Sequence, residues 1–98
     1  MPNQSHKLYI LVDKTLTPSQ RAVQACHVAI EFAKAFPEWK HESLVLLAVD
    51  GEDDMLDYYK RILGGYMRVG FQEPYWDNRF TTIACYGCDD LVKDLTLL

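Results

Sequence analysis

The sequence predicts one α/β domain over residues 1–98, with helices on the faces of a small sheet. Two short apolar runs, 7–12 and 43–49, have the continuous hydrophobic character of strands that are buried on both faces. A helical pattern follows each run, and two further strand patterns lie near the end of the chain. The order strand–helix–strand–helix–strand–strand, with a closing helix or turn, is typical of a single layered sheet.

The first strand, 7–12, leads directly into Asp13, Lys14 and Thr15. These residues leave the carboxyl end of a central strand, where open α/β sheets tend to bind ligands. Lys14 is therefore a candidate substrate contact, and an ordinary exposed lysine is the alternative.

The start of the first helix is marked by its side chains. Thr17 can cap it, Pro18 suits the first helical position, and Gln20 can complete a capping box. We expect the helix to reach Phe36, because Pro37 disfavours helical geometry in the residue before it.

The two sides of this helix differ in chemistry when residues are projected at about 100° each. The side expected to pack on the sheet consists of Ala22, Ala25, Cys26, Ala29, Ala33 and Phe36. The opposite side consists of Gln20, Gln24, His27, Glu31 and Lys34. This polar row is either a solvated helix face or a row of ligand-binding side chains.

After this helix, Trp39 is expected to fold back over the core rather than to stack on a base. Beyond the strand 43–49, acidic residues from Glu52 onward open a second helix at its positive end, and glycines 64–65 end it. The residues expected to face the sheet are Met55, Leu56, Tyr59, Ile62 and Leu63.

The segment 73–79 joins the last two strands, 67–72 and 80–86, and is dense in aromatic and charged residues. Such a loop either delivers a carboxylate, an arginine and a stacking ring to a site, or is held by its own Tyr75 and Trp76. A short helix or turn then precedes Leu97 and Leu98, which are expected to tuck in.

The net charge of −4 is unfavourable for binding nucleic acid, but residues 1–41 carry +2 and residues 42–98 carry −6. We therefore expect a polyanion to bind the N-terminal half. Neither a membrane-spanning run nor a secretory signal pattern is present, and three cysteines form no regular framework, which predicts a cytoplasmic protein. Cys85 and Cys88 are expected to be reduced, free of metal and structural, since a zinc site needs two further ligands.

The string Ala-Val-Gln-Ala-Cys-His-Val-Ala at 22–29 resembles the Ala-Ala-Gln-x-x-His-Ala signature of the type II peptidyl-tRNA hydrolases. The segments 16–24 and Phe-Gln-Glu-Pro at 71–74 are similar to a small bacterial and phage branch of that family. The resemblance covers essentially the whole chain. It implies a three-layer α/β/α domain with a four-stranded mixed sheet, which is often dimeric, so we expect a homodimer or a monomer–dimer mixture.

Members of that family hydrolyse the ester between a peptide and the 3′ end of tRNA without a metal, so the resemblance implies a tRNA or peptidyl-tRNA partner and no cofactor. By position, Gln24 and His27 match the family's glutamine and histidine, and Thr82 falls near its threonine. Gln20 stands where the enzymes usually have a lysine, and the loop from Glu73 replaces their Asp-Ala-Gly-x-Thr-Gln segment.

Ester cleavage requires an activated water and donors for the developing oxyanion. His27 is the natural general base, and Glu73 is the carboxylate that would orient it. The candidate substrate-binding residues are Lys14, Gln20, Arg21, Gln24, Arg79 and Thr82.

Three functions follow from these patterns. The favoured one is a peptidyl- or aminoacyl-tRNA hydrolase, and the second is an inactive relative that binds tRNA ends or another nucleotide. The third is a protein-interaction module, such as a phage factor acting on a host protein. A basic groove beside His27 would favour the first two, and an exposed apolar patch would favour the third.

Overall fold

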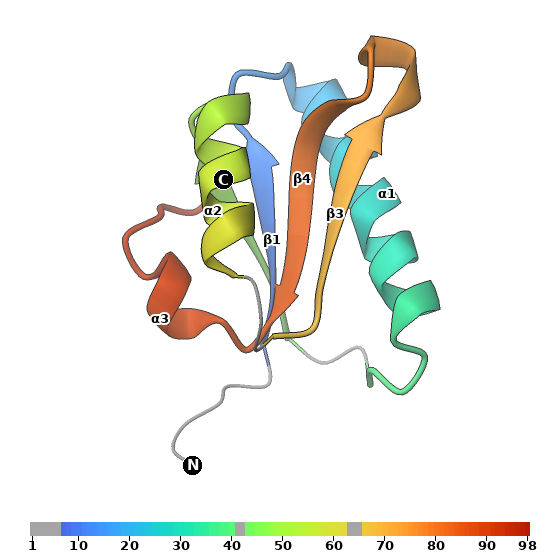
Figure 1. Ribbon diagram of the computed structural model, residues 1–98, viewed down its shortest axis with the longest axis vertical. Coiled ribbons are helices and arrows are strands. Elements are labelled where there is room, and N and C mark those ends of the chain that lie inside the picture. The colour runs from blue at the N-terminus through green and yellow to red at the C-terminus, as the bar shows by residue number, and fades with distance from the viewer. Residues whose placement is uncertain (1–6, 41–42, 63–65) are drawn as a thin grey trace.

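A computed structural model describes residues 7–40, 43–62 and 66–98 (Figure 1). Its elements are β1 (Lys7–Asp13), α1 (Pro18–Ala35), β2 (Ser43–Val49), α2 (Glu52–Arg61), β3 (Arg68–Glu73), a 3₁₀ turn (Pro74–Trp76), β4 (Arg79–Tyr86) and α3 (Asp89–Val92). The predicted order is confirmed, and the 3₁₀ turn is an addition to it. Within these ranges every helix is too short or too polar to cross a membrane.

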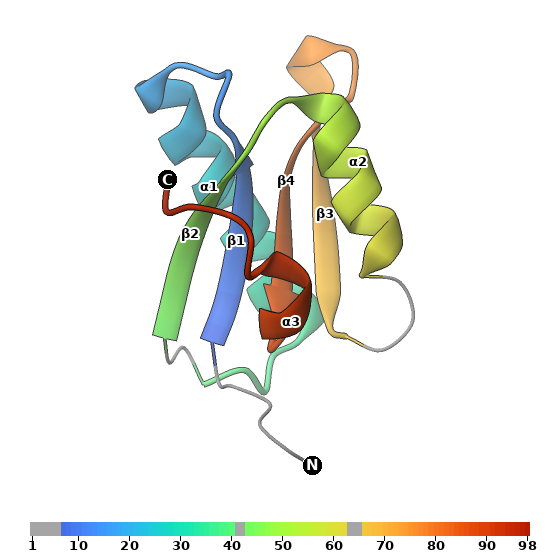
Figure 2. The same ribbon diagram turned by 90° about the vertical axis from the view of Figure 1, so that its left-hand side faces the viewer.

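The four strands form one mixed sheet in the order β2-β1-β4-β3. β1 is parallel to β2, whereas β4 is antiparallel to both of its neighbours. α1 covers one face of the sheet, and α2 and α3 lie over the other (Figures 1 and 2). Because β4 is antiparallel to both β1 and β3, the strands β1, β2 and β3 all run in the same direction. Their carboxyl ends therefore lie at the same end of the sheet, together with the β1–α1 and β3–β4 connections.

β1 is buried on both faces, as its continuous apolar run predicts. The cluster against α1 consists of Leu8, Ile10, Val12, Ala25, Val28, Phe32 and Ala84. The cluster against α2 and α3 consists of Tyr9, Leu11, Leu47, Val49, Met55, Ile62, Phe80, Ile83, Cys85, Cys88 and Val92. The sheet therefore has a hydrophobic core on each side.

The capping box that begins α1 is present. The backbone N–H of Gln20 donates to the Thr17 hydroxyl at 3.2 Å, and the Thr17 N–H donates to the Gln20 side-chain oxygen at 3.0 Å. The helix ends at Ala35, one residue before the predicted Phe36 and two before Pro37.

The packing side of α1 is not the predicted alanine side. The buried residues are Gln24, Ala25, Val28 and Phe32, which are centred roughly a quarter turn away around the helix axis. Val28 and Phe32 bury more apolar surface than alanines would, and a buried glutamine is stable when its amide is hydrogen-bonded. Gln24 therefore does not belong to a solvated face.

Two predictions about side-chain packing have different outcomes. Trp39 folds back over the core, with its ring edge-on to Phe32 at a centroid distance of 5.4 Å. In α2, Met55 and Ile62 are fully buried, but Leu56 is 36% exposed and does not pack as predicted. Leu63 and the glycines 64–65 lie outside the described residues.

The C-terminal segment extends the sheet at the edge of β2 through its backbone. The Ala48 N–H donates to the Thr96 carbonyl at 2.9 Å, and the Leu98 N–H donates to the Leu46 carbonyl at 3.1 Å. Leu97 is 74% exposed and Leu98 39%, so the prediction that both tuck in is wrong. Backbone hydrogen bonds with β2 therefore hold this segment in place. The homodimer expected from the sequence stays a prediction.

Cys85 and Cys88 lie in the core with no exposed surface, whereas Cys26 is exposed on α1. The Cys88 thiol donates to the backbone carbonyl of Cys85 at 3.6 Å. The neighbouring Cys88 thiol and burial both raise the pKa of Cys85. Burial therefore keeps both thiols from reagents, and the raised pKa keeps Cys85 in its protonated form.

We expect only one of the three cysteines to react rapidly with a thiol reagent in the native protein, because a thiolate must be both formed and reached. A Cys26→Ser variant should lose the rapid phase and keep two thiols that react only on unfolding. Rapid reaction of two or more thiols in the folded protein would contradict the described burial.

Candidate functional site

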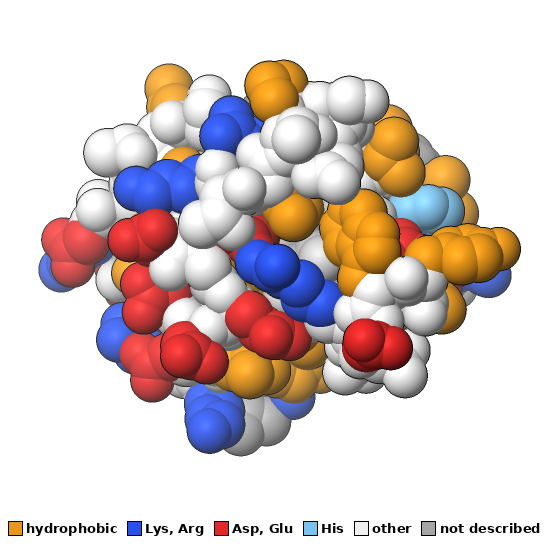
Figure 3. Space-filling view, turned by 90° about the horizontal axis from the view of Figure 1, so that it is seen from above, with side chains coloured by type: hydrophobic (Ala, Val, Ile, Leu, Met, Phe, Trp, Pro, Cys, Tyr) orange, Lys and Arg blue, Asp and Glu red, His pale blue; other side chains and the backbone are white. Residues whose placement is uncertain are grey.

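A cleft of about 580 Å³ opens between the N-terminal half of α1 and the β3–β4 connection. Its lining residues are Ser19, Gln20, Val23, Gln24, His27, Phe71, Glu73, Pro74, Tyr75 and Trp76. Figure 3 looks onto this end of the molecule and shows a histidine surface bordered by hydrophobic side chains. Both predicted catalytic residues, His27 and Glu73, therefore line the same cleft.

Glu73 is fixed by the local backbone at the end of β3. Its side-chain Oε1 caps the 3₁₀ turn by accepting from the Tyr75 N–H at 3.3 Å. Its backbone carbonyl accepts from the Asn78 N–H at 3.0 Å. Asp77 and Asn78 both adopt left-handed backbone geometry, which these two residue types tolerate better than most. The sequence of the loop thus turns the Glu73 carboxylate back toward α1.

Gln24 connects this carboxylate to β4 through a buried chain of hydrogen bonds. Its amide nitrogen donates to Glu73 Oε2 at 2.7 Å, and its amide oxygen accepts from the Thr81 hydroxyl at 2.7 Å. Gln24 is 1% exposed and Thr81 is fully buried. Because Thr81 supplies a donor and Glu73 supplies an acceptor, the amide of Gln24 can satisfy both in only one orientation.

Glu73 is only 6% exposed and yet favours its charged form. The hydrogen bond from Gln24 lowers its pKa, burial opposes that effect, and the Tyr75 N–H and the charge of His27 lower it further. The net result is a pKa below the ordinary value of 4.5. The cleft therefore holds a buried carboxylate at neutral pH.

His27 lies one helical turn beyond Gln24, on the exposed side of α1. Its ring stacks on Phe71 of β3, with a centroid distance of 4.9 Å and an interplanar angle of 6°. This contact sets the orientation of the imidazole plane at the rim of the cleft. The histidine is thus placed by packing while its ring edge stays available to a ligand.

Of the remaining predicted substrate-binding residues, the cleft brings only Gln20 together with His27. Gln20 lines the cleft, but its side-chain oxygen is already used in the capping box. Thr82 is fully buried against α1, and its hydroxyl lies 3.5 Å from the backbone carbonyl of Gln24. The Thr82 hydroxyl is therefore not free to donate to an oxyanion, whereas the capping box leaves the Gln20 amide nitrogen, which is a donor, unused.

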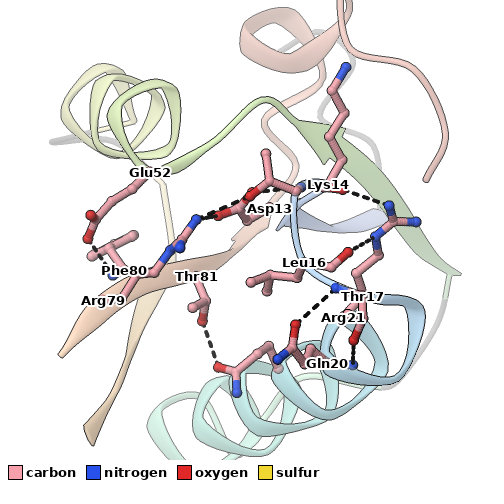
Figure 4. A network of polar contacts seen from close by, with 12 residues as sticks. Asp13, Lys14, Leu16, Thr17, Gln20, Arg21, Glu52, Arg79, Phe80 and Thr81 are labelled. Carbon is pink, nitrogen blue, oxygen red and sulfur yellow. Dashed lines mark hydrogen bonds and ion pairs between the residues drawn. The ribbon is translucent and has the colours of Figure 1, made fainter. Parts of the chain in front are cut away.

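Arg21 and Lys14 lie at the β1–α1 connection instead of in the cleft (Figure 4). The Arg21 guanidinium donates to the Leu16 carbonyl at 3.0 Å and to the Lys14 carbonyl at 2.6 Å. Arg21 therefore braces the connection. Lys14 is exposed, and Figure 4 shows its side chain extending away from α1.

Arg79 forms a second polar cluster with the end of β1 (Figure 4). Its guanidinium donates to Asp13 Oδ2 at 2.6 Å and to the Thr15 hydroxyl at 3.1 Å. Asp13 has no exposed surface, and Thr15 donates to its Oδ1 through both its backbone N–H and its hydroxyl. Burial alone would raise the pKa of Asp13, but the bonds from Thr15 and Arg79 hold it below 3.8.

The sequence allowed the connection between β3 and β4 to deliver a carboxylate, an arginine and a stacking ring to a site, and the structure matches this interpretation only in part. It delivers the Glu73 carboxylate and the Tyr75 ring to the cleft, but it commits Arg79 to Asp13. Sequence reasoning missed Val23, Phe71 and Thr81 as members of the site. Phe71 does belong to the Phe-Gln-Glu-Pro segment and Thr81 is next to Thr82, but their contacts with α1 depend on the tertiary fold.

No protein-family model matches the chain, and no curated protein matches it. The fold is shared with a solved structure of a protein of unknown function from Agrobacterium tumefaciens. The TM-score is 0.76 at 11% sequence identity, over 94% of this chain and 96% of that chain. At this identity the likeness establishes the small α/β fold, with its four-stranded mixed sheet and three helices, and no activity.

Chemically, the cleft combines a ring nitrogen base, a buried anion and apolar walls. Within the described part of the chain, no three His, Cys, Asp or Glu side chains gather as a metal site requires. The arrangement is suited to moving a proton between a bound water and a leaving group, with the carboxylate stabilising the imidazolium formed on the way.

Proposed function

We propose that the protein hydrolyses the ester that joins a peptidyl or aminoacyl group to the 3′ end of tRNA. The observation that supports this function is the convergence of His27 and Glu73, from separate elements, on one cleft. The resemblance of the Gln24-x-x-His27 helix to the type II peptidyl-tRNA hydrolases supports the choice of substrate. In this reaction His27 acts as general base, and Glu73 stabilises its charge.

The proposed step begins with a water held by an imidazole nitrogen of His27. The nitrogen takes a proton from the water, the water oxygen bonds to the ester carbonyl carbon, and a tetrahedral oxyanion forms. The bond from that carbon to the ribose oxygen then breaks, and the imidazolium returns its proton to the ribose oxygen. The Glu73 carboxylate stabilises the imidazolium because it lies near His27 and is charged at neutral pH.

The charge distribution supports a binding mode in which the acyl end of the tRNA ester enters the cleft and the tRNA phosphates stay outside it. None of its lining residues is a lysine or arginine. Lys14, in the β1–α1 connection, is an exposed cation at this end of the sheet. We propose that tRNA phosphates contact this connection while the ester reaches His27.

Release of tRNA from labelled peptidyl-tRNA and from aminoacyl-tRNA by the purified protein tests the function. We expect turnover with at least one of the two esters and a loss of turnover in His27→Ala. An absence of release from both esters, with the protein folded and tRNA bound, would leave binding of tRNA ends as the function.

Reversing the charge of Lys14 is expected to weaken tRNA binding several-fold, because phosphate contacts through lysine release counterions. The slope of log affinity against log salt should also fall by about one. Lys60→Glu, at an exposed position of α2 on the other face of the sheet, is the matched control. Arg21 is unsuitable because its guanidinium supports the backbone. Equal weakening by both reversals would contradict this assignment of the binding face.

A protein-interaction module is the second candidate, and one observation favours it. Two apolar side chains at the cleft are exposed, Tyr75 at 92% and Val23 at 49%. An exposed apolar surface without lysine or arginine is typical of a peptide-binding groove as much as of an acyl pocket. Failure to bind tRNA at low salt, together with binding of an apolar peptide, would decide for this candidate.

A further inference from the structure

Of the two buried carboxylates in the described chain, one has a cationic side chain as its partner and the other does not. Asp13 is paired with Arg79, whereas Glu73 forms no ion pair with any lysine or arginine of residues 7–40, 43–62 and 66–98. Among the described residues, Glu73 interacts with the Gln24 amide, the Tyr75 N–H and the charge of His27. Buried charges in proteins are normally paired, so a carboxylate without a cation at the wall of a cleft is suited to a cationic ligand.

The Glu73 carboxylate keeps the capacity to bind such a ligand. Two carboxylate oxygens offer about four acceptor positions, and the contacts from Gln24 and Tyr75 occupy one on each oxygen. An ammonium group can therefore bind without displacing either donor. The low exposure of Glu73 makes a charged hydrogen bond at this position stronger than one in open water.

The remaining walls of the cleft define what accompanies the cation. They are formed largely by Val23, Phe71, Pro74, Tyr75 and Trp76. Apolar and aromatic walls suit an apolar side chain, and an aromatic ring face also attracts a cation. None of the described residues that line the cleft is a lysine or arginine that would compete for Glu73.

We propose that the cleft binds a primary ammonium next to an apolar side chain, and hence that the substrate class is aminoacyl-tRNA with a free α-amino group rather than N-blocked peptidyl-tRNA. The choice of tRNA ester rests on the proposed function. The ammonium site itself rests on Glu73 and the cleft walls.

Binding of three small probes tests the ammonium site without turnover. L-Phenylalanine methyl ester carries the ammonium, N-acetyl-L-phenylalanine methyl ester blocks it, and methyl 3-phenylpropionate lacks it. In NMR titrations at pH 6 we expect the first to bind at least about tenfold more tightly than the other two, because a charged hydrogen bond at a poorly hydrated carboxylate is lost. Equal affinities of the three probes would overturn the proposal.

Glu73→Gln should abolish this preference while keeping a similar side-chain shape. Asp53→Asn, at an exposed position on α2, removes the same charge away from the cleft and should keep the preference. If Glu73→Gln unfolds, Tyr75→Ala supplies the second test. Because an aromatic ring face attracts a cation, it should weaken binding of the ammonium probe more than binding of the other two, and equal weakening of all three would contradict the ammonium site. A preference that survives in folded Glu73→Gln, or that is lost equally in Asp53→Asn, would overturn the role of Glu73.

Two further comparisons separate this inference from the function on which it rests. Faster cleavage of N-acetyl-phenylalanyl-tRNA than of phenylalanyl-tRNA would overturn the substrate class and leave the hydrolase. Ammonium preference in the titrations without cleavage of either tRNA would overturn the hydrolase and leave the ammonium site. Tighter binding of a Phe-Gly-Gly peptide than of phenylalanine methyl ester would assign the site to a peptide N-terminus and overturn the aminoacyl ester.

Discussion

His27→Ala is expected to reduce turnover of the tRNA ester by roughly 10²- to 10⁴-fold, the usual contribution of a general base. Affinity for tRNA should change little, because the phosphate contacts proposed for Lys14 lie outside the cleft. The free energy of unfolding should fall by no more than about 1 kcal/mol, since His27 is exposed and loses only its stack on Phe71. Single-turnover kinetics and thermal unfolding measure the two effects separately.

Lys34→Ala is the matched control for this substitution, because Lys34 is an exposed polar residue of the same helix and lies away from the cleft. It should leave both turnover and stability nearly unchanged. A folded His27→Ala protein with full turnover would remove the proposed base. A grossly unfolded one would show that the Phe71 stack has a structural role larger than its exposure indicates.

Arg79→Met is expected to give the largest loss of stability among the polar substitutions discussed, about 2–3 kcal/mol. It leaves Asp13, which has no exposed surface, as a buried charge without its cation. The loss should fall below the 3–5 kcal/mol typical of a fully buried pair, because the Arg79 side chain is 37% exposed and water can partly replace it. For a chain of 98 residues this corresponds to a fall in Tm of roughly 10–20 °C.

The double variant Asp13→Asn/Arg79→Met supplies the control, because it removes both charges together. It should recover part of the stability lost in the single variant, and the double-mutant cycle gives the coupling energy of the pair. Additive losses would show that Asp13 and Arg79 act independently.

Acid unfolding provides a second measure of the same pair. The pKa of Asp13 is lowered in the folded protein, so the unfolded chain binds a proton more readily and stability decreases as the pH falls. The stabilisation from this pair is fully present above the ordinary aspartate pKa of 3.8 and is lost as the pH falls through the lower pKa of the folded protein. Asp13→Asn/Arg79→Met should therefore flatten the stability profile below about pH 4, whereas Lys34→Ala should not.

Much of the fold could be predicted from local patterns. Continuous apolar runs identified β1 and β2, and the Thr17 capping box fixed where α1 begins. These features depend on residues that are close in sequence, so local chemistry is sufficient to read them. The prediction of which side of α1 packs on the sheet was wrong. The larger apolar side chains of Val28 and Phe32 and the buried, hydrogen-bonded Gln24 outweighed the clustering of alanines.

The sequence could predict only those parts of the candidate site whose residues lie close together within one helix or one loop. The spacing of Gln24 and His27 marked α1, and the dense loop marked Glu73, but the two segments are separated by nearly fifty positions. Arg79 and Arg21 looked equally available for phosphate, yet one pairs with Asp13 and the other with backbone carbonyls. Such commitments are made by long-range contacts, which a linear pattern does not contain.

By itself, the sequence determined the order of the helices and strands, the start of α1 and the residue types able to move a proton. The tertiary structure decided that Gln24 is buried between Glu73 and Thr81, that His27 is stacked on Phe71, and that Glu73 has no lysine or arginine partner among the described residues. The physical reason is that propensity and capping act between near neighbours in the chain. Burial, charge pairing and the shape of a cleft arise only when distant segments pack together.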